Sequence, residues 1–193
     1  MDDQAVAGGD KDALRRSILT ARRQLSDDAR ATAADAIAAH LLAAPFTRVE
    51  RVAAYLSMGS EPGTGELIDG FVARGAEVIL PVTGPDQSLD WVLHVPGAPV
   101  TMSAVGIPEP GGPRLGAGAL SSAGLVIVPA LAVDHGGWRL GRGAGYYDRA
   151  LPSAGAPVCA LVYASELLEV VPHEDHDVPV DLVVTEAGIF RVP

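Results

Sequence analysis

The segment from Arg139 to Arg149 carries the residues best suited to chemistry on a phosphorylated ligand. It reads Arg139-Leu140-Gly141-Arg142-Gly143-Ala144-Gly145-Tyr146-Tyr147-Asp148-Arg149. Three glycines at alternate positions allow the backbone to approach a ligand closely and to aim successive N–H groups at an anion. Arg139 and Arg142 can add charge-assisted hydrogen bonds to phosphate oxygens. The segment therefore predicts a cradle for a triphosphate.

The sequence disfavours several other classes of enzyme site. The spacing Gly141-x-Gly143-x-Gly145 does not match the dinucleotide fingerprint and does not open a helix directly after a strand, which argues against an NAD site. The only lysine is Lys11, and its neighbours do not match a P-loop, a protein kinase or a Schiff-base enzyme. The chain contains no Gly-x-Ser-x-Gly motif, so a serine hydrolase has little support.

Charge is distributed unevenly along the chain of 193 residues. The formal net charge is -10, which argues against a nucleic-acid or membrane partner, because both require a basic surface. However, 8 of the 14 basic residues lie between positions 11 and 51, and 3 more lie between 139 and 149. If the first helix packs beside the glycine segment, a locally cationic site results on an acidic protein.

Cysteine content and the N-terminal sequence predict a cytoplasmic protein. The single Cys159 cannot form an internal disulfide or complete a cysteine-based metal site alone. The first ten residues are acidic and contain glycine, where a signal peptide would be basic and then apolar. We expect residues 1–10 to form a disordered tail and residues 11–193 to form a single domain.

The N-terminal part of that domain is predicted to be helical. Apolar residues in 11–25 follow helical spacing, with arginines elsewhere around the helix. Ser26 followed by two aspartates is an N-cap signal, so a second helix should run through Leu41 and stop before Pro45. We expect the two helices to form a hairpin.

The remainder of the chain alternates short apolar runs with helical or loop segments, which is typical of an α/β protein with a mainly parallel sheet covered on both faces. The run at 89–95 alternates more and is predicted to be an edge hairpin strand, and 97–118 is predicted to be a long functional loop. The other predicted strands are 52–57, 77–81, 124–129, 156–163 and 181–185, with a helical or loop segment at 64–74. In such sheets the ligand binds beyond the carboxyl ends of the strands.

Motifs along nearly the whole chain resemble those of the 5-formyltetrahydrofolate cyclo-ligases, also called methenyltetrahydrofolate synthetases. The longest is Val128-Pro129-x-Leu131-Ala132-x-Asp134-x-x-Gly137-x-Arg139-Leu140-Gly141-x-Gly143-x-Gly145-Tyr146-Tyr147-Asp148-Arg149. The others are Lys11-x-x-Leu14-Arg15, Tyr55-Leu56-Ser57-x-x-x-Glu61-x-x-Thr64, Pro81 after a strand, Gly106-Ile107-Pro108-Glu109-Pro110 and Asp177-Val178-Pro179-Val180-Asp181-x-x-x-Thr185-Glu186.

The resemblance implies a three-layer α/β/α sandwich with a Rossmann-like sheet. The implied reaction converts ATP and 5-formyltetrahydrofolate to ADP, phosphate and 5,10-methenyltetrahydrofolate, with Mg2+ as the cofactor. The formyl oxygen is phosphorylated first, and N10 then attacks the activated carbon. The expected partners are ATP and the folate, including its polyglutamates, and the expected state is a monomer.

The resemblance also implies a role for individual residues. Arg142 and Tyr146 would be catalytic, and Asp148 and Asp177 would hold Mg2+. The implied ATP contacts are Lys11, Arg15, Arg139, Leu140, Gly141, Arg142, Gly143, Ala144, Gly145, Tyr146 and Tyr147. The implied folate contacts are Leu56, Glu61, Arg142, Gly143, Ala144, Gly145 and Tyr146. A carboxylate such as Glu61 can accept hydrogen bonds from the amino-pyrimidine edge of a pterin.

Three departures from the family pattern concern the pocket. Ala144 supplies no side-chain phosphate contact, Val133 replaces a commoner phenylalanine, and Val105 stands where an aromatic residue is sometimes found. Two alternative functions remain open: a catalytically inactive paralogue that binds folate or nucleotide, and a phosphosugar isomerase or transferase on a related scaffold. His173 and His176 are interpreted as part of a polar loop rather than a transition-metal site.

Overall fold

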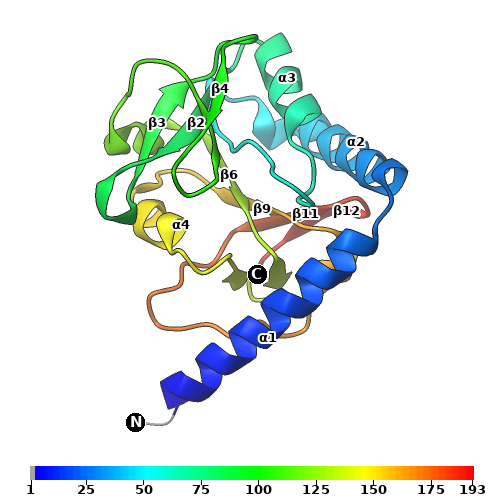
Figure 1. Cartoon of the computed structure of the whole chain (residues 1–193). Helices are drawn as coiled ribbons and strands as arrows, with labels where there is room; N and C mark the ends of the chain where they lie inside the picture. The colour runs from blue at the N-terminus through cyan, green and yellow to red at the C-terminus, as the bar shows by residue number, and fades with distance from the viewer. Residues whose placement is uncertain (1–2) are drawn as a thin grey trace.

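Residues 3–193, which a computed structural model describes, are organised around a seven-stranded sheet (Figure 1). Its strands, from edge to edge, are β12 (Gly188–Arg191), β11 (Leu182–Thr185), β9 (Val158–Leu161), β6 (Leu125–Pro129), β1 (Arg51–Ala53), β2 (Glu77–Thr83) and β3 (Leu89–Leu93). The five central strands of this sheet run parallel, whereas β3 and β12 pair antiparallel at the edges. The predicted parallel sheet and the predicted edge strand are confirmed.

Strand β12 was not predicted. Its four residues are half-buried or exposed, so they form no continuous apolar run in the sequence. The strand exists because it pairs with β11 along its whole length, from Leu182 opposite Arg191 to Thr185 opposite Gly188. Pairing of this kind is a tertiary contact that short-range sequence patterns do not report.

Both faces of the sheet are covered, which makes three layers. On one face, helices α2 (Asp27–Ala43) and α3 (Gly65–Ala73) pack against Val52 and Val78. On the other face, the short helices η3 (Ala117–Ser122), α4 (Tyr146–Ala150) and η4 (Leu151–Ser153) cover Ala53 and Ile79. Adjacent residues of one strand point to opposite faces, which explains why the strands of this sheet are buried on both sides.

Helix α2 starts where the sequence predicts. The Ser26 side chain accepts a hydrogen bond from the Ala29 amide at 3.1 Å, and the helix ends at Ala43, before Pro45. Helix α1 spans Asp3–Gln24 and therefore begins eight residues before Lys11, within the segment 1–10 for which the sequence predicts a disordered tail. The division into a tail and a single domain stays a prediction. Met1 and Asp2 lie outside the described residues.

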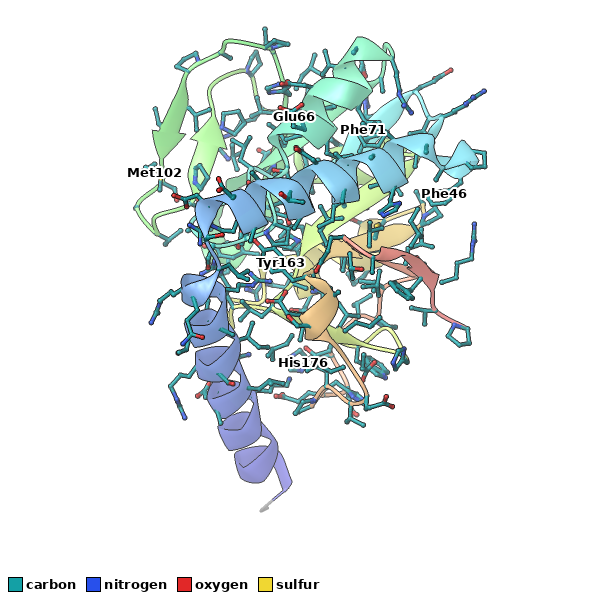
Figure 2. All side chains as sticks on the ribbon, turned by 90° about the vertical axis from the view of Figure 1, so that its right-hand side faces the viewer. Phe46, Glu66, Phe71, Met102, Tyr163 and His176 are labelled. Atoms are coloured by element: carbon teal, nitrogen blue, oxygen red, sulfur yellow. The ribbon has the colours of Figure 1, made fainter. Side chains whose placement is uncertain are left out.

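The expected hairpin of α1 and α2 is wrong. Figures 1 and 2 show the two helices turning sharply away from each other instead of lying side by side. Their apolar faces belong to different clusters, because Ile18 of α1 packs with Leu131 and Leu140, whereas Ile37 of α2 packs with the main sheet. Helix α1 thus leaves the sandwich and covers a small sheet of β10 (Leu167–Leu168), β7 (Ala132–Asp134) and β8 (Arg139–Leu140).

The segment 97–118, expected to be a loop, contains a hairpin of β4 (Val100–Met102) and β5 (Pro108–Pro110). Glu109 attaches this hairpin to the main sheet. Its carboxylate accepts hydrogen bonds from the Thr83 amide at 2.6 Å and from the Thr83 hydroxyl at 2.5 Å. The remaining short helices are η1 (Pro45–Thr47), η2 (Pro85–Gln87) and η5 (Ala164–Glu166). No helix in the described part of the chain is long and apolar enough to span a membrane.

Cys159 lies at the centre of the sheet and gives a test of the core. Burial raises the pKa of its thiol from 9.0 to about 12. The unfolded chain releases this proton at lower pH, so the stability that the neutral thiol contributes is complete below pH 9 and is lost as the pH rises toward 12. We expect the free energy of unfolding to fall with pH in this window by up to about 1.4 kcal/mol per unit more steeply than in Cys159→Ala.

Urea titrations of both proteins at about pH 8 and about pH 10 measure this difference. An equal change of the unfolding free energy with pH in the two proteins would contradict the raised pKa of Cys159. The buried tyrosines titrate in both proteins, so their contribution cancels in the comparison.

Candidate active site

A cavity of about 760 Å³ opens at the carboxyl ends of β1 and β6. These strands are neighbours, and the chain leaves β1 for β2 on one side before returning to β6 on the other. Their following loops therefore diverge, which is the usual origin of a binding crevice in an open α/β sheet. Tyr55 and Leu56 line the cavity after β1, and Ala130 and Leu131 line it after β6.

The structure brings every predicted site residue to this one cavity. Segments far apart in the sequence meet here, since α1, the loop after β1, the glycine segment and the loop before β11 all contribute. The predicted residues in its wall are Lys11, Arg15, Leu56, Glu61, Arg139, Leu140, Gly141, Arg142, Gly143, Ala144, Gly145, Tyr146, Tyr147, Asp148 and Asp177. Their individual roles stay predictions.

The glycine loop connects β8 to α4, and its backbone explains two of its glycines. Gly143 has φ of 102° and Gly145 has φ of 69°, a region that side chains with a Cβ rarely adopt. Arg15 of α1 packs across this loop and donates a hydrogen bond from Nε to the carbonyl oxygen of Gly141 at 3.0 Å. Helix α1 therefore fixes the loop against which a phosphate would bind.

Lys11 lies at the same end of the cavity and is nearly buried. Its Nζ is 3.0 Å from a carboxylate oxygen of Glu174 and 2.8 Å from one of Asp177. Burial alone would lower the pKa of the Lys11 ammonium, but the hydrogen bonds to Asp177 and Glu174 outweigh it and raise the pKa. Burial alone would raise the pKa of Asp177, but the hydrogen bond from Lys11 outweighs this effect and lowers the pKa. Both groups are charged at neutral pH.

The side chains of Arg139 and Leu140 make their contacts with other parts of the protein. The Arg139 guanidinium donates to the Val178 carbonyl at 2.8 Å and to Asp148 at 2.6 Å, and Leu140 is buried in the cluster beneath α1. Arg139 thus positions Asp148 and the loop near Val178. These contacts explain why Arg139 and Leu140 belong to the motif, even without a direct contact between either side chain and ATP.

Arg142 and Glu61 face each other across the cavity. The Arg142 Nε donates to a carboxylate oxygen of Glu61 at 3.0 Å, and the Met58 amide donates to the other oxygen at 2.9 Å. The Glu61 side chain is 6% exposed, whereas that of Arg142 is 43% exposed. Glu61 is therefore fixed in the wall, and Arg142 is the partner that can move.

The site is less cationic than the sequence suggested. Within the described residues, each lysine and arginine in the cavity wall pairs with a carboxylate: Lys11 with Glu174 and Asp177, Arg15 with Asp12, Arg139 with Asp148, and Arg142 with Glu61. The positive charge that an anionic ligand meets in this cavity is therefore partly neutralised by these carboxylates.

A model of the 5-formyltetrahydrofolate cyclo-ligase family matches residues 7–186. The chain belongs to this family. It is 40% identical over 182 residues to the cyclo-ligase of Mycolicibacterium smegmatis, covering 91% of this chain and 93% of the relative. It is 31% identical over 153 residues to the cyclo-ligase of Escherichia coli strain K12, covering 76% and 84%.

Solved structures agree with this assignment. The 5,10-methenyltetrahydrofolate synthetase of Aquifex aeolicus matches with a TM-score of 0.80 and 30% identity, covering 94% of this chain and 92% of that one. The synthetase of Mycoplasma pneumoniae matches with a TM-score of 0.73 and 20% identity, covering 92% and 99%, and supports the fold alone. The predicted α/β fold is confirmed as that of the cyclo-ligase family.

The three departures from the cyclo-ligase pattern differ in their position. Val133 is fully buried in β7 and belongs to the core beneath α4, away from the cavity wall. Val105, at the tip between β4 and β5, lines the cavity and is 60% exposed. Ala144 lies in the glycine loop, where its carbonyl accepts a hydrogen bond from Arg149 at 2.7 Å.

The second wall of the cavity includes residues that the sequence analysis did not assign to the site. Ile107 and Pro108 of the β4–β5 hairpin line it, as do Thr83 and Gln87 near the turn between β2 and β3. The glycine and proline content of 97–118 signalled a functional loop, but no local pattern indicated that the hairpin folds back over the cavity.

The interpretation of the histidine-containing loop as a polar loop stays a prediction. His173 stacks on Trp138 with ring centroids 3.9 Å apart, while His176 lies beside Glu174 and Asp177. No group of three or more potential metal ligands occurs among the described residues.

Proposed function

We propose that the protein catalyses the ATP-dependent conversion of 5-formyltetrahydrofolate to 5,10-methenyltetrahydrofolate, with release of ADP and phosphate. The observation that carries this proposal is the single cavity in which the glycine loop, Lys11 and Arg142 face the buried carboxylate of Glu61. Membership of the cyclo-ligase family supports the same reaction. The residues expected to bind phosphate and those expected to bind the pterin line one cavity, which supports the proposal.

The chemistry explains why ATP is needed. The formyl carbon on N5 is part of an amide and is a poor electrophile. The formyl oxygen attacks the γ-phosphorus of ATP, and the bond to the ADP oxygen breaks. N10 then attacks the activated carbon and loses its proton, and the C–O bond breaks as phosphate leaves. The product carries the methenyl bridge between N5 and N10.

The chain contributes positioning and charge neutralisation, which are the main requirements of phosphoryl transfer. The N–H groups of the glycine loop and the Lys11 ammonium would hold the phosphates. Glu61 would accept hydrogen bonds from the pterin amino edge with the oxygen that now contacts Arg142. Arg142 would then turn toward the transferring phosphoryl group, and Tyr146 would pack on the formyl-bearing part of the folate.

Mg2+ would be held by Asp148 and Asp177. One oxygen of each carboxylate accepts a hydrogen bond from Arg139 or Lys11, and within the described residues the other oxygen stays outside such bonds. This donor set fits Mg2+, which uses one or two protein carboxylates together with substrate phosphates and water. When bound, the ion would neutralise part of the phosphate charge.

We also propose that the protein acts in the cytoplasm as a monomer, on 5-formyltetrahydrofolate and its polyglutamates. The net charge of -10 supports the absence of nucleic-acid and membrane partners.

The deciding experiment follows the methenyl chromophore by absorbance. Purified protein with Mg-ATP and 5-formyltetrahydrofolate is expected to generate it, and omission of ATP is expected to abolish it. Binding of the folate without any ATP-dependent signal would favour the inactive paralogue. Absence of both binding and signal would favour an enzyme of another class.

Glu61→Gln provides a separate prediction on the folate side. The amide keeps the size of the side chain but presents an N–H group where the pterin needs an acceptor. We expect KM for 5-formyltetrahydrofolate to rise at least tenfold, which corresponds to about 1.4 kcal/mol, and KM for ATP to change about twofold or less. Steady-state kinetics with each substrate varied in turn measure both. A comparable rise in KM for ATP would show that Glu61 acts mainly by holding Arg142.

A further inference from the structure

Two tyrosines in the cavity wall, Tyr55 and Tyr147, have hydroxyl groups that the protein does not satisfy. Both hydroxyl oxygens are buried, and neither has a hydrogen-bond partner within the described residues. Tyr55 as a whole residue is only 4% exposed. Buried polar groups are almost always hydrogen-bonded, because leaving one unpaired costs about 1–3 kcal/mol. The two hydroxyls therefore require an explanation.

The two rings reach the cavity from opposite faces of the sheet. Tyr55 follows β1 and packs in the core beneath α2 and α3, whereas Tyr147 lies in α4 and packs against the core of the other face. Their backbones are held by the end of a central strand and by the turn after the glycine loop. Rings anchored in two separate cores are rigid, as a recognition site requires.

Electrostatics connects both hydroxyls with Glu61. Burial raises the pKa of each phenol, and the negative charge of Glu61 raises both further. Each hydroxyl is therefore neutral at physiological pH and can both donate and accept a hydrogen bond. The two oxygens of Glu61 accept bonds from Arg142 and the Met58 amide, and neither tyrosine hydroxyl bonds to this carboxylate within the described residues.

We propose that Tyr55 and Tyr147 determine specificity for the folate, by hydrogen-bonding through their hydroxyls to the polar pyrimidine edge of the pterin that Glu61 holds. This inference rests on the proposed function. The pterin edge alternates donors with acceptors, and a carboxylate can serve only the donors. Two hydroxyls beside Glu61 supply the complementary donors from the protein. The resemblance places Tyr147 among the ATP contacts, so the inference assigns its hydroxyl to the other substrate.

The test compares Tyr55→Phe and Tyr147→Phe with the wild-type protein and with Tyr163→Phe. Tyr163 is the control because it is 4% exposed, like Tyr55, but lies outside the cavity wall, and its hydroxyl donates to the Ser60 carbonyl at 3.4 Å. For each protein, Kd for 5-formyltetrahydrofolate without ATP, KM for both substrates and the thermal midpoint without ligand are measured.

We expect Tyr55→Phe and Tyr147→Phe each to raise Kd and KM for the folate about tenfold and to leave KM for ATP within about twofold. Their ligand-free thermal midpoints should equal or exceed that of the wild type, because an unpaired hydroxyl is removed. Tyr163→Phe should leave both folate constants unchanged.

Two results would overturn the inference. One is folate affinity unchanged in both cavity variants while the wild type still forms the chromophore, which would mean that water satisfies the hydroxyls. The other is a lowered ligand-free midpoint with unchanged affinity, which would indicate a structural role. A wild type that binds the folate but forms no chromophore would contradict the proposed function and leave the inference intact if the variants lose affinity.

Discussion

Lys11→Ala is expected to lower kcat/KM for ATP about a hundredfold or more, because loss of one preorganised electrostatic contact to a phosphoryl group typically costs about 3 kcal/mol. The structure adds a second reason. Lys11 bridges Glu174 and Asp177 at 3.0 and 2.8 Å, so its removal leaves two uncompensated carboxylates facing the phosphates. Affinity for 5-formyltetrahydrofolate should change far less, since Lys11 bonds to Glu174 and Asp177 and not to Glu61, the carboxylate expected to hold the pterin.

Further variants separate the loss of the phosphate contact from the effect of the uncompensated carboxylates. Arg16→Ala is the matched control, because Arg16 is an exposed basic residue of the same helix outside the cavity wall, and it should leave both substrate constants unchanged. Adding Glu174→Gln to Lys11→Ala should restore part of the activity if the residual carboxylates repel ATP. Equal losses of ATP use and folate binding in Lys11→Ala would refute the role assigned to Lys11.

Arg22→Ala is expected to destabilise the protein by about 3–5 kcal/mol, the usual cost of removing one partner of a buried ion pair. The Arg22 guanidinium contacts the two oxygens of Glu166 at 2.6 and 2.8 Å and the Ala130 carbonyl at 2.8 Å. The two side chains are 1% and 6% exposed. The substitution would leave a carboxylate buried without its cation and would release α1 from the wall of the cavity.

Urea unfolding measures this effect, with Arg23→Ala as the control, because Arg23 is the exposed neighbour on the same helix. The double variant Arg22→Met with Glu166→Gln should recover most of the lost stability, since replacing both partners of a buried pair is often nearly neutral. The amide can still accept the hydrogen bond that the Tyr163 amide makes with Glu166. A loss below about 1 kcal/mol in Arg22→Ala would mean that the pair is not isolated from water.

Arg22 also shows why the function of α1 was only partly predictable. In the sequence it is one of several arginines on an amphipathic helix and carries no motif. Arg22 anchors the helix together with the apolar packing of Ile18, and the same helix places Lys11 and Arg15 in the cavity wall, where Arg15 contacts the glycine loop. The basic face that the sequence suggested is thus divided between an anchor, Arg22, and two residues of the cavity wall.

The sequence by itself indicated the α/β fold class and the glycine loop, and its resemblance to the cyclo-ligases implied the full set of predicted cavity residues. The fold class and the loop depend on local patterns: apolar runs for buried strands, an N-cap at Ser26, and glycines where the backbone needs positive φ. The motif residues are recognisable because their spacing within a segment is short and regular.

Only the tertiary structure decided which of these residues meet. Lys11 pairs with carboxylates 163 and 166 residues away, and Arg142 pairs with Glu61, 81 residues away. Tertiary contacts also decided three other features: the divergence of α1 from α2, the hairpin over the cavity and the unpaired tyrosine hydroxyls. Each depends on contacts between segments that are distant along the chain, and the strand order of the sheet, not local residue spacing, brings those segments together.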